Sequence, residues 1–435
     1  MKPNGLIIAV AVLAVLGGAT WWSNKKQAQA SKSTDTTTKI LSIPSDQFQE
    51  IRLKKPAETI DVTGGPGKWR LTQPEALPAD PDTVGSLITT LGGLNADAVV
   101  EDKASDLTPY GLKEPALDVQ IVKKDGKTDD LMIGDETPTG SGNYAKLAND
   151  PRVFTIATYN KNAIDKPLND LRDKRLLTFD SAKLTRVELD AKGMPIEFGK
   201  NSGGDWQILK PKPWRADGSQ VDTLVNNLKD ARMDLTGDTK AAATDFASGA
   251  KVATATVTDS SGNQTLEIRK KGDNYYAKSS AVAGIFKVSA DTGKNFDKGL
   301  DDFRNKKVYD FGFSDPSYLN IQGAGYTKNG DKWMAGSKTM DNTSVQNVID
   351  KLRDLTATKV ADSGGGTMVL EADVTSSNGK RIEKVSISKQ GDQYFAKREN
   401  EPGVYVLDSK AVDDLQKAIS GIKEAAPAPA QAKKK

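Results

Sequence analysis

The stretch Lys68-Trp69-Arg70-Leu71-Thr72-Gln73-Pro74 decides the fold, because its pattern recurs twice further along the chain. A short strand-like segment carries a tryptophan, and a polar turn and an amphipathic helical pattern follow it. The second copy starts at Asp205-Trp206 and the third at Lys332-Trp333. The tryptophans lie roughly 130 residues apart, a period too long for a solenoid repeat and long enough for a complete domain. The sequence therefore predicts one domain in three copies.

The helical pattern after each tryptophan has the same phase in all three copies. Its apolar residues recur at i, i+3, i+4 and i+7, which places them on one face of an α-helix. Asp80 or Asp82 in the first copy, and Asp217 or Ser219 in the second, can accept hydrogen bonds from the first helical turn. This shared phase is the main indication that the copies have the same fold. The apolar positions are Val84, Leu87, Ile88 and Leu91; Val221, Leu224, Val225 and Leu228; and Val345, Val348, Ile349 and Leu352.

Turn signals on both sides of each helix indicate antiparallel strands. Gly64-Gly65-Pro66-Gly67 precedes the first tryptophan, and Asx-Gly and Lys-Gly turns separate the later alternating segments. The predicted fold class is α+β, with three tandem repeats after one N-terminal transmembrane helix. Each repeat is expected to contain a β-hairpin, a helix, a four-stranded antiparallel meander and a closing helix. The predicted closing helices are Tyr159–Leu168, Thr292–Asp302 and Lys410–Ile422, and the predicted repeats one, two and three span 41–180, 181–310 and 311–424.

The first residues differ in kind from the rest of the chain. Leu6–Trp22 is uncharged and, at about 17 residues, is long enough to cross a bilayer as a helix. We expect residues 1–24 to be a retained transmembrane anchor. A cleaved signal peptide is the alternative, because Ala28-Gln29-Ala30 fits a cleavage site. The residues expected at the membrane–water interface are Trp21, Trp22, Lys25 and Lys26.

Polar, low-complexity segments flank the three repeats. Residues 25–40 read as a polar linker, and residues 425–435 read as a disordered tail rich in alanine, proline and lysine. The short flank before the apolar segment, followed by a large polar body, favours export of that body.

The composition excludes several kinds of chemistry. The 435 residues include no cysteine and no histidine, which removes thiol nucleophiles, disulfides and imidazole-based catalysis or metal binding. The net charge of +3 gives no basic excess of the kind that nucleic-acid binders show, so we expect no nucleic-acid partner.

Motifs for histidine-free chemistry are also weak. Gly64–Trp69 has a Gly-Lys pair, but Trp69 stands where a phosphate-binding loop needs Ser or Thr. Ser-x-x-Lys occurs several times without a second motif. Adjacent acids such as Asp301-Asp302 point to different sides of their element, unlike the facing carboxylates of a glycosidase. The sequence predicts no catalytic residue, no cofactor and no metal ligand, and hence a protein that is not an enzyme.

Aromatic residues recur at matching positions and have two interpretations. They are either core anchors, which we favour, or a stacking platform for sugars or bases. The candidate ligand-stacking residues are Trp69, Trp206, Trp333, Tyr144, Tyr276 and Tyr394.

At these landmarks the chain resembles the bacterial domain-of-unknown-function family 4340. Repeat three departs most, because Pro74 and Pro211 have no counterpart there. The resemblance implies a membrane-anchored protein of the bacterial inner membrane, single-pass, with its soluble body in the periplasm. It also implies genes beside gliding-motility-type ABC transporter genes, and it carries over no catalytic residue. The matching residues are Trp69-x-Leu71, Pro74, Ala79-Asp80, Asp106-Leu107-x-x-Tyr110-Gly111-Leu112-x-x-Pro115, Ile133-Gly134, Tyr144-Ala145-Lys146 and Leu171-Arg172-Asp173-Lys174-Arg175-Leu176-Leu177-x-Phe179.

These observations lead to one leading functional expectation and two alternatives. The leading one is a non-enzymatic, membrane-anchored periplasmic accessory or scaffold protein of an ABC-type transport or envelope system, with transporter subunits as partners. The first alternative is a protein that binds cell-envelope polysaccharide through exposed aromatic residues. The second is a histidine-free hydrolase, which needs two carboxylates that converge in a cleft.

Overall fold

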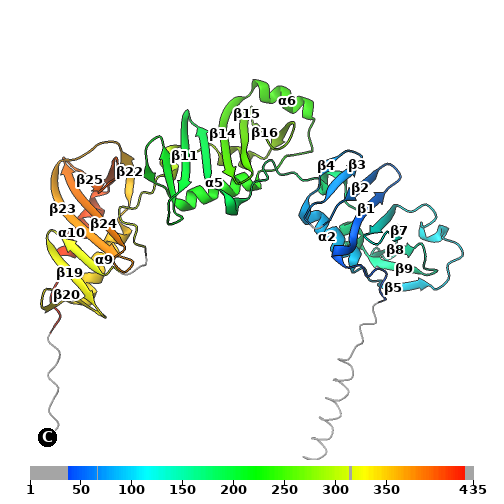
Figure 1. Ribbon diagram of the computed structural model, residues 1–435, viewed down its shortest axis with the longest axis horizontal. Coiled ribbons are helices and arrows are strands. Elements are labelled where there is room, and N and C mark those ends of the chain that lie inside the picture. The colour runs from blue at the N-terminus through cyan, green and yellow to red at the C-terminus, as the bar shows by residue number, and fades with distance from the viewer. Residues whose placement is uncertain (1–37, 66, 313–315, 427–435) are drawn as a thin grey trace, which may run out of the picture. The chain divides into compact units, whose positions relative to one another are not determined.

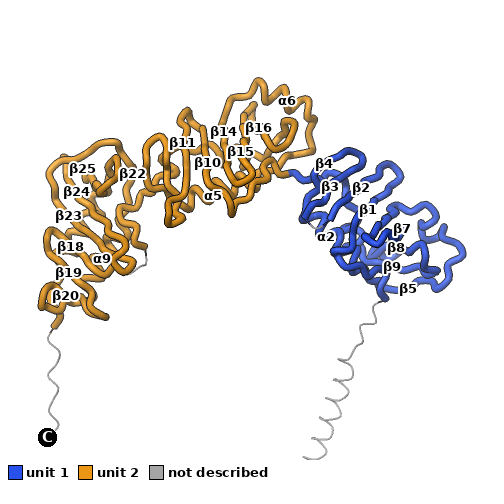
Figure 2. The backbone as a smooth tube through the Cα atoms, viewed as in Figure 1, with its two compact units in different colours: residues 1–174 blue, residues 175–435 orange. Residues whose placement is uncertain are grey.

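The computed structural model describes residues 38–65, 67–312 and 316–426. The chain divides into two compact units, Met1–Lys174 and Arg175–Lys435 (Figure 2). The first unit contains repeat one, and the second contains repeats two and three. The predicted outer limits of the repeats stay predictions.

Repeat one is built on a single antiparallel sheet. Its elements are η1 (Ser45–Gln47), β1 (Phe48–Lys54), β2 (Thr59–Thr63), β3 (Arg70–Gln73), β4 (Leu77–Pro78), α2 (Pro81–Gly92), β5 (Ala98–Glu101), η2 (Thr108–Tyr110), β6 (Leu117–Lys123), β7 (Thr128–Glu136), β8 (Gly142–Leu147), β9 (Val153–Ala157), α3 (Thr158–Ile164) and α4 (Leu168–Leu171). The nine strands follow the order β4-β3-β2-β1-β6-β7-β8-β9-β5. The tryptophan hairpin and the meander join in this sheet because β1 pairs with β6.

Repeat two has the same arrangement with eight strands. Its elements are η3 (Ser181–Lys183), β10 (Arg186–Ala191), β11 (Met194–Lys200), β12 (Trp206–Lys210), β13 (Trp214–Arg215), α5 (Gly218–Asp230), α6 (Thr239–Ser248), β14 (Ala250–Asp259), β15 (Gly262–Lys271), β16 (Asn274–Ser279), β17 (Ile285–Val288), α7 (Ala290–Asn295) and α8 (Leu300–Phe303). The strand order is β13-β12-β11-β10-β14-β15-β16-β17. Figure 1 labels β11, β14, β15 and β16 of this sheet, with α5 and α6.

Repeat three returns to nine strands. Its elements are β18 (Tyr318–Ile321), β19 (Ala324–Asn329), β20 (Lys332–Ala335), β21 (Lys338–Thr339), α9 (Asn342–Asp354), β22 (Ala357–Ala361), β23 (Thr367–Ser376), β24 (Arg381–Gln390), β25 (Gln393–Arg398), β26 (Val404–Leu407) and α10 (Ser409–Ser420). The strand order is β21-β20-β19-β18-β23-β24-β25-β26-β22.

One long helix in each repeat covers the sheet with its apolar face. Helices α2, α5 and α9 each bury the four apolar positions that the sequence pattern indicates. Each begins at an aspartate whose carboxylate accepts a hydrogen bond from a main-chain N–H group of the first turn, which satisfies a donor that the helix leaves open. These N-cap residues are Asp80, Asp217 and Asp341.

Equivalent main-chain hydrogen bonds join the start of the long helix to the last segment of each repeat. The N–H group of each N-cap aspartate donates to the exit segment of its own repeat: Asp80 to the carbonyl of Leu171, Asp217 to Phe303 and Asp341 to Lys423, at 2.7–2.9 Å. In the second unit, Val308 then donates to the carbonyl of Leu355, just after α9, at 3.0 Å. The chain that leaves repeat two is thus paired with both repeats.

Repeats two and three share one hydrophobic core. A single cluster of buried side chains runs from Leu176 to Ala418 and includes residues of both sheets and both long helices. Repeat one has a separate core within its own unit.

The predicted α+β fold class is wrong. The described residues form mainly three large antiparallel sheets, a β-rich fold, because hairpin and meander merge through the pairs β1–β6, β10–β14 and β18–β23. Such pairing covers strand edges that would otherwise lack hydrogen-bond partners. Two predicted closing helices are each broken into two short pieces. In repeat one the break falls at Lys166-Pro167, where the residue before a proline avoids helical geometry.

The predicted single-pass localisation in the inner membrane is also corrected. In 38–65, 67–312 and 316–426 no helix has the length and apolar character that a membrane crossing requires. The predicted anchor Leu6–Trp22 lies outside the described residues, as do Trp21, Trp22, Lys25, Lys26 and most of the predicted linker and tail.

Candidate functional site

The recurring aromatic residues lie in separate repeats and are mostly buried. The side chains of Trp69, Trp206, Trp333, Tyr276 and Tyr394 are all less than a tenth exposed, and Tyr144 is half-buried. Two of them form short side-chain hydrogen bonds within repeat two: Trp206 Nε1 donates to Asp222 Oδ1 at 2.7 Å, and the Tyr276 hydroxyl donates to Asp245 at 2.6 Å. Rings buried to this degree favour the interpretation as core anchors, and a stacking platform at these positions stays a prediction.

A cavity in repeat two is lined in part by Trp206. It has a volume of about 1180 Å³ and lies between the start of β12, the first turn of α5 and the segment from Asp301 to Asp310. We call it the α5 groove. Lys200 lies over the Trp206 ring, with Nζ 4.9 Å from the ring centroid, and so places a cation at the rim.

Repeat three has an equivalent cavity of about 810 Å³, which we call the α9 groove. It lies between Trp333 and the first turn of α9, and Lys328 lines it. Lys200 pairs with Trp206 across two strands, and Lys328 pairs with Trp333 in the same way. The two grooves therefore occupy matching places in repeats two and three.

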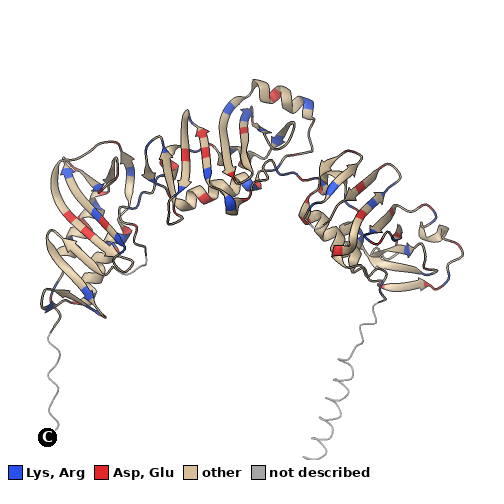
Figure 3. Ribbon diagram, viewed as in Figure 1, with Lys and Arg blue, Asp and Glu red and all other residues tan. Residues whose placement is uncertain are grey.

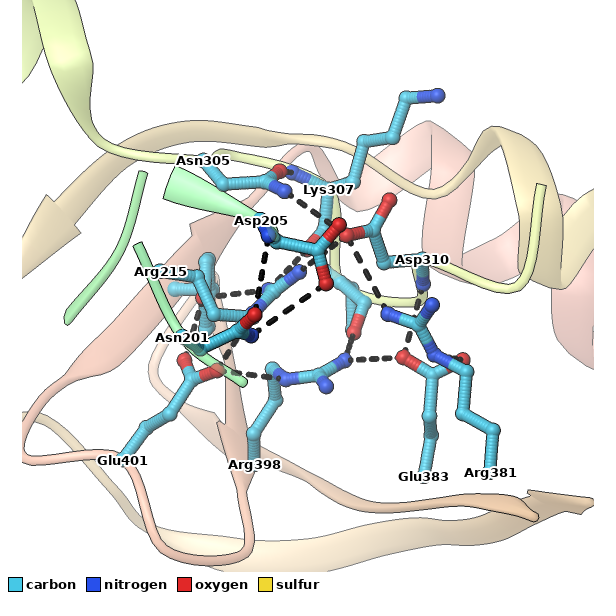
Figure 4. Close-up of polar contacts among 12 residues, drawn as sticks. Asn201, Asp205, Arg215, Asn305, Lys307, Asp310, Arg381, Glu383, Arg398 and Glu401 are labelled. Carbon is cyan, nitrogen blue, oxygen red and sulfur yellow. Dashed lines mark hydrogen bonds and ion pairs between the residues drawn. The ribbon is translucent and has the colours of Figure 1, made fainter. Parts of the chain in front are cut away.

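The far wall of the α5 groove is a charged network that joins repeats two and three (Figure 4). Arg215 of β13 is its centre. Its Nε donates to Glu401 Oε1 at 2.6 Å, and one Nη donates to the Tyr405 hydroxyl at 2.7 Å and to the carbonyl of Lys307 at 2.6 Å. The side chains of Arg215 and Glu401 are 14% and 10% exposed.

The network continues through repeat three. Arg398 Nε donates to Glu401 at 2.9 Å, and its Nη1 donates to Glu383 at 3.0 Å. Arg381 lies 3.4 Å from Asp310 and 3.5 Å from Glu383. Three arginines and three acids thus alternate, so every buried charge has an opposite charge beside it, as burial requires.

Burial perturbs the proton affinities of this network. Burial alone lowers the pKa of the Arg215 guanidinium, but Tyr405 and Glu401 beside it raise that pKa above its ordinary value. Burial raises the pKa of the Tyr405 phenol well above its ordinary value, although Arg215 opposes the shift. At neutral pH the arginine is therefore charged and the phenol is neutral, as their hydrogen bond requires.

An apolar contact supports the network. Trp214 packs against Tyr405, with ring centroids 5.6 Å apart. A Cβ atom on Gly403 would lie 3.0 Å from the Trp214 ring, so glycine there allows the close approach of the two repeats.

Sequence reasoning missed Trp214, Arg215 and Glu401. A comparison of the three repeats marks two of these residues. Trp214-Arg215 occupies the place of Leu77-Pro78 in repeat one and of Lys338-Thr339 in repeat three. A large aromatic residue and an arginine at this place in repeat two alone indicate a contact that only repeat two makes.

Four acidic residues in the α5 groove form hydrogen bonds or ion pairs with neighbouring residues of repeat two. Asp217 caps α5, and Asp222 accepts from Trp206. Asp301 forms an ion pair with Arg304 at 2.8 Å, and Asp302 accepts from the N–H group of Gly299 at 2.7 Å. Basic and acidic residues are interspersed along the strands of these two repeats (Figure 3). That the chain has no catalytic, cofactor or metal residue stays a prediction.

Comparison with known proteins identifies a family. The model of a domain of unknown function, DUF4340, matches residues 69–243 and again residues 206–368. The two matches begin at Trp69 and Trp206 and confirm the predicted internal repeat. No curated protein and no solved structure matches the chain.

Proposed function

We propose that the chain, which belongs to the DUF4340 family, is a non-enzymatic accessory or scaffold protein of an ABC-type transport or envelope system. The class of partner comes from the family resemblance. The non-enzymatic role is supported by a sequence without cysteine or histidine and by groove acids that are engaged in caps and ion pairs.

The observation that carries the proposal is the shared core of repeats two and three. Domains joined by small polar contacts move relative to one another, whereas a large apolar contact holds them fixed. Here a common core and the Arg215–Glu401 network join the two repeats. The α5 and α9 grooves are therefore held at a constant spacing, which suits a scaffold that grips one partner at two places.

Site-specific photo-crosslinking tests this function. Gln220 and Gln346 are exposed and line the α5 and α9 grooves, so a photoreactive residue at either position reports on a groove-bound partner. Asn263, exposed near the start of β15 and absent from the lining of both grooves, is the matched control. We expect mass spectrometry to identify an ABC transporter subunit in the Gln220 and Gln346 adducts and not in the Asn263 adduct. Repeated recovery of no transporter subunit from either groove position would contradict the proposal.

The two alternatives lack a supporting observation. Polysaccharide binding depends on exposed aromatic residues, but Trp206 and Tyr276 are each only 6% exposed. A hydrolase needs two carboxylates available for proton transfer, and those of the α5 groove accept structural hydrogen bonds or form an ion pair.

A further inference from the structure

The three sheets differ at one edge. In repeat one β5 pairs with β9, and in repeat three β22 pairs with β26, so a ninth strand closes the meander in both. In repeat two the strand order ends at β17. The α5 and α9 grooves lie elsewhere, beside the tryptophan hairpins.

The register of the meanders shows which residues correspond. Ala145 pairs with Phe154, Ala277 with Phe286 and Ala396 with Tyr405. Ile285 of repeat two therefore matches Val153 and Val404. Across from these two residues, the ninth strands place Glu101 and Ala361.

In repeat two a single β-bridge, between Asp234 and Lys287, stands where repeats one and three have a ninth strand. The N–H group of Asp234 donates to the carbonyl of Lys287 at 2.8 Å, as that of Asp97 does to Thr155 in repeat one. The Asp234 carboxylate then accepts from the N–H group and hydroxyl of Thr236, at 2.9 and 2.6 Å, which turns the chain away. The main-chain carbonyl of Lys287 therefore points to the outer edge of the sheet, away from β16. Main-chain groups of residues two apart point to the same side of an antiparallel strand, so the N–H and C=O groups of Ile285 point to the outer edge too.

Helix α6 supplies apolar side chains where a ninth strand would supply them, but it is not part of the sheet. In repeat three Ala361 of β22 packs with Phe395, Val404 and Val406. In repeat two Ala242 and Phe246 of α6 pack with the equivalent Tyr276 and Ile285. The face of the sheet is covered in both repeats. A cavity of about 110 Å³, the size of one aliphatic side chain, remains beside Ile285, Tyr276 and Asp234.

We propose that the outer edge of β17 is a docking site for an extended segment of a partner protein, which adds to the sheet as an antiparallel ninth strand. Main-chain hydrogen bonds supply the affinity of such strand addition, and side-chain pockets supply its specificity. The inference stands apart from the proposed transport role, because it rests on the edge of β17 and not on the α5 and α9 grooves.

The chain's own ninth strands indicate the chemistry of the occupant. Val99 of β5 and Val360 of β22 hold the same place in their sheets, paired with Phe154 and Tyr405. A valine-like residue therefore suits that place in repeat two. Lys287 and Lys278 lie on the same face as Ile285, and repeat one has Glu101 across from the residue that matches Ile285. The occupant is thus a short segment with a β-branched residue followed by an acidic one.

A synthetic peptide with the sequence of residues 95–104 is the probe, since it contains β5. The full chain is mixed with the peptide, and amide hydrogen exchange is measured at β17. We expect exchange at Ile285 to slow roughly tenfold when the peptide concentration is ten times its Kd. Exchange at Val404, whose edge β22 already covers, serves as the internal control and stays unchanged.

Two matched controls make the test specific. A peptide N-methylated on the bonding edge of its strand cannot complete the ladder and is expected to give no protection. The K287E variant keeps the main chain and reverses the charge, and it is expected to weaken peptide binding several-fold. The proposal is overturned by no protection at Ile285, by equal protection from the methylated peptide, or by an Ile285 already protected through concentration-dependent dimers, which would make a second copy the occupant.

Discussion

Repeats two and three have matching sheets, matching long helices and one common core. They differ in the segment that follows the long helix, α5 in repeat two and α9 in repeat three. After α9 the chain enters β22 at once, with the strand-forming sequence Ala357-Thr358-Lys359-Val360-Ala361. After α5 it meets Asp234-Leu235-Thr236-Gly237-Asp238, which is rich in turn and cap residues, and forms α6. The two repeats thus differ in sequence at the point where one sheet gains a ninth strand and the other ends at β17.

The two repeats also differ in how they attach to a neighbour. Repeat two offers Trp214 and Arg215, and repeat three receives them with Tyr405 and Glu401. The corresponding hairpin of repeat three has Lys338 and Thr339, and there Lys338 forms an ion pair with Glu424 of the same repeat. We call the contact of Trp214 and Arg215 with Tyr405 and Glu401 the joint, and it uses a different surface of each of the two repeats.

Truncating equivalent core residues should give the largest effect and show whether the repeats are one cooperative body. Leu228 of repeat two and Leu352 of repeat three are fully buried in the common core. We expect Leu228→Ala and Leu352→Ala each to lower the free energy of unfolding by about 4 kcal/mol, from lost burial and the cavity left behind. Denaturant unfolding of the full chain should show both repeats melting in a single transition. Separate transitions, each sensitive to only one substitution, would break the account of a shared core.

Breaking the charged joint should have the next largest effect. Glu401→Ala leaves Arg215 and Arg398 without their shared carboxylate in a poorly solvated place. We expect a loss of about 3 kcal/mol, because an uncompensated buried charge is costly. Lys384→Ala, which removes an exposed partner of Glu399, is the matched control and should change stability by less than about 1 kcal/mol. Equal effects of the two variants, measured by urea titration, would show that the joint does not hold the repeats together.

The phenol at the joint should make stability depend on alkaline pH. Repeat two has Phe286 where repeat three has Tyr405. Because the folded-state pKa of Tyr405 is raised above about 10, its contribution is fully present below pH 10 and is lost as pH rises towards the folded-state pKa. We expect Tyr405→Phe to cost about 2 kcal/mol near pH 7, through two lost hydrogen bonds to charged groups, and to reduce the loss of stability above pH 10. Unfolding curves that fall equally steeply above pH 10 in both proteins would argue against a buried neutral phenol.

The helix caps should give the smallest effect and the closest match between repeats. Asp217 and Asp341 cap α5 and α9 with the same chemistry. We expect Asp217→Ala and Asp341→Ala each to cost about 1 kcal/mol. Thermal unfolding that separates the two by several kcal/mol would show that the helices are not equivalent.

Local features of this fold are predictable from the sequence. The helix faces follow from residue spacing, and Asp80 and Asp217 are the caps because they precede the periodic segments. The merging of hairpin and meander was not predictable, since β1 pairs with β6 across a helix and many intervening residues. The break of the closing helix in repeat one does have a local signal, because Pro167 disfavours helical geometry at Lys166. Glu401 is brought to Arg215 only by tertiary packing, so no local pattern marks it, whereas Trp214-Arg215 differs in kind from the matching residues of repeats one and three.

Amide hydrogen exchange in the unliganded full chain tests the central contrast most directly. Ile285 and Val404 hold the same place in their sheets, but only Val404 has a ninth strand beside it. We predict that the Ile285 amide exchanges roughly a hundredfold faster than the Val404 amide, as an open edge differs from a closed one. Equal protection of the two amides in the monomeric chain would contradict the account.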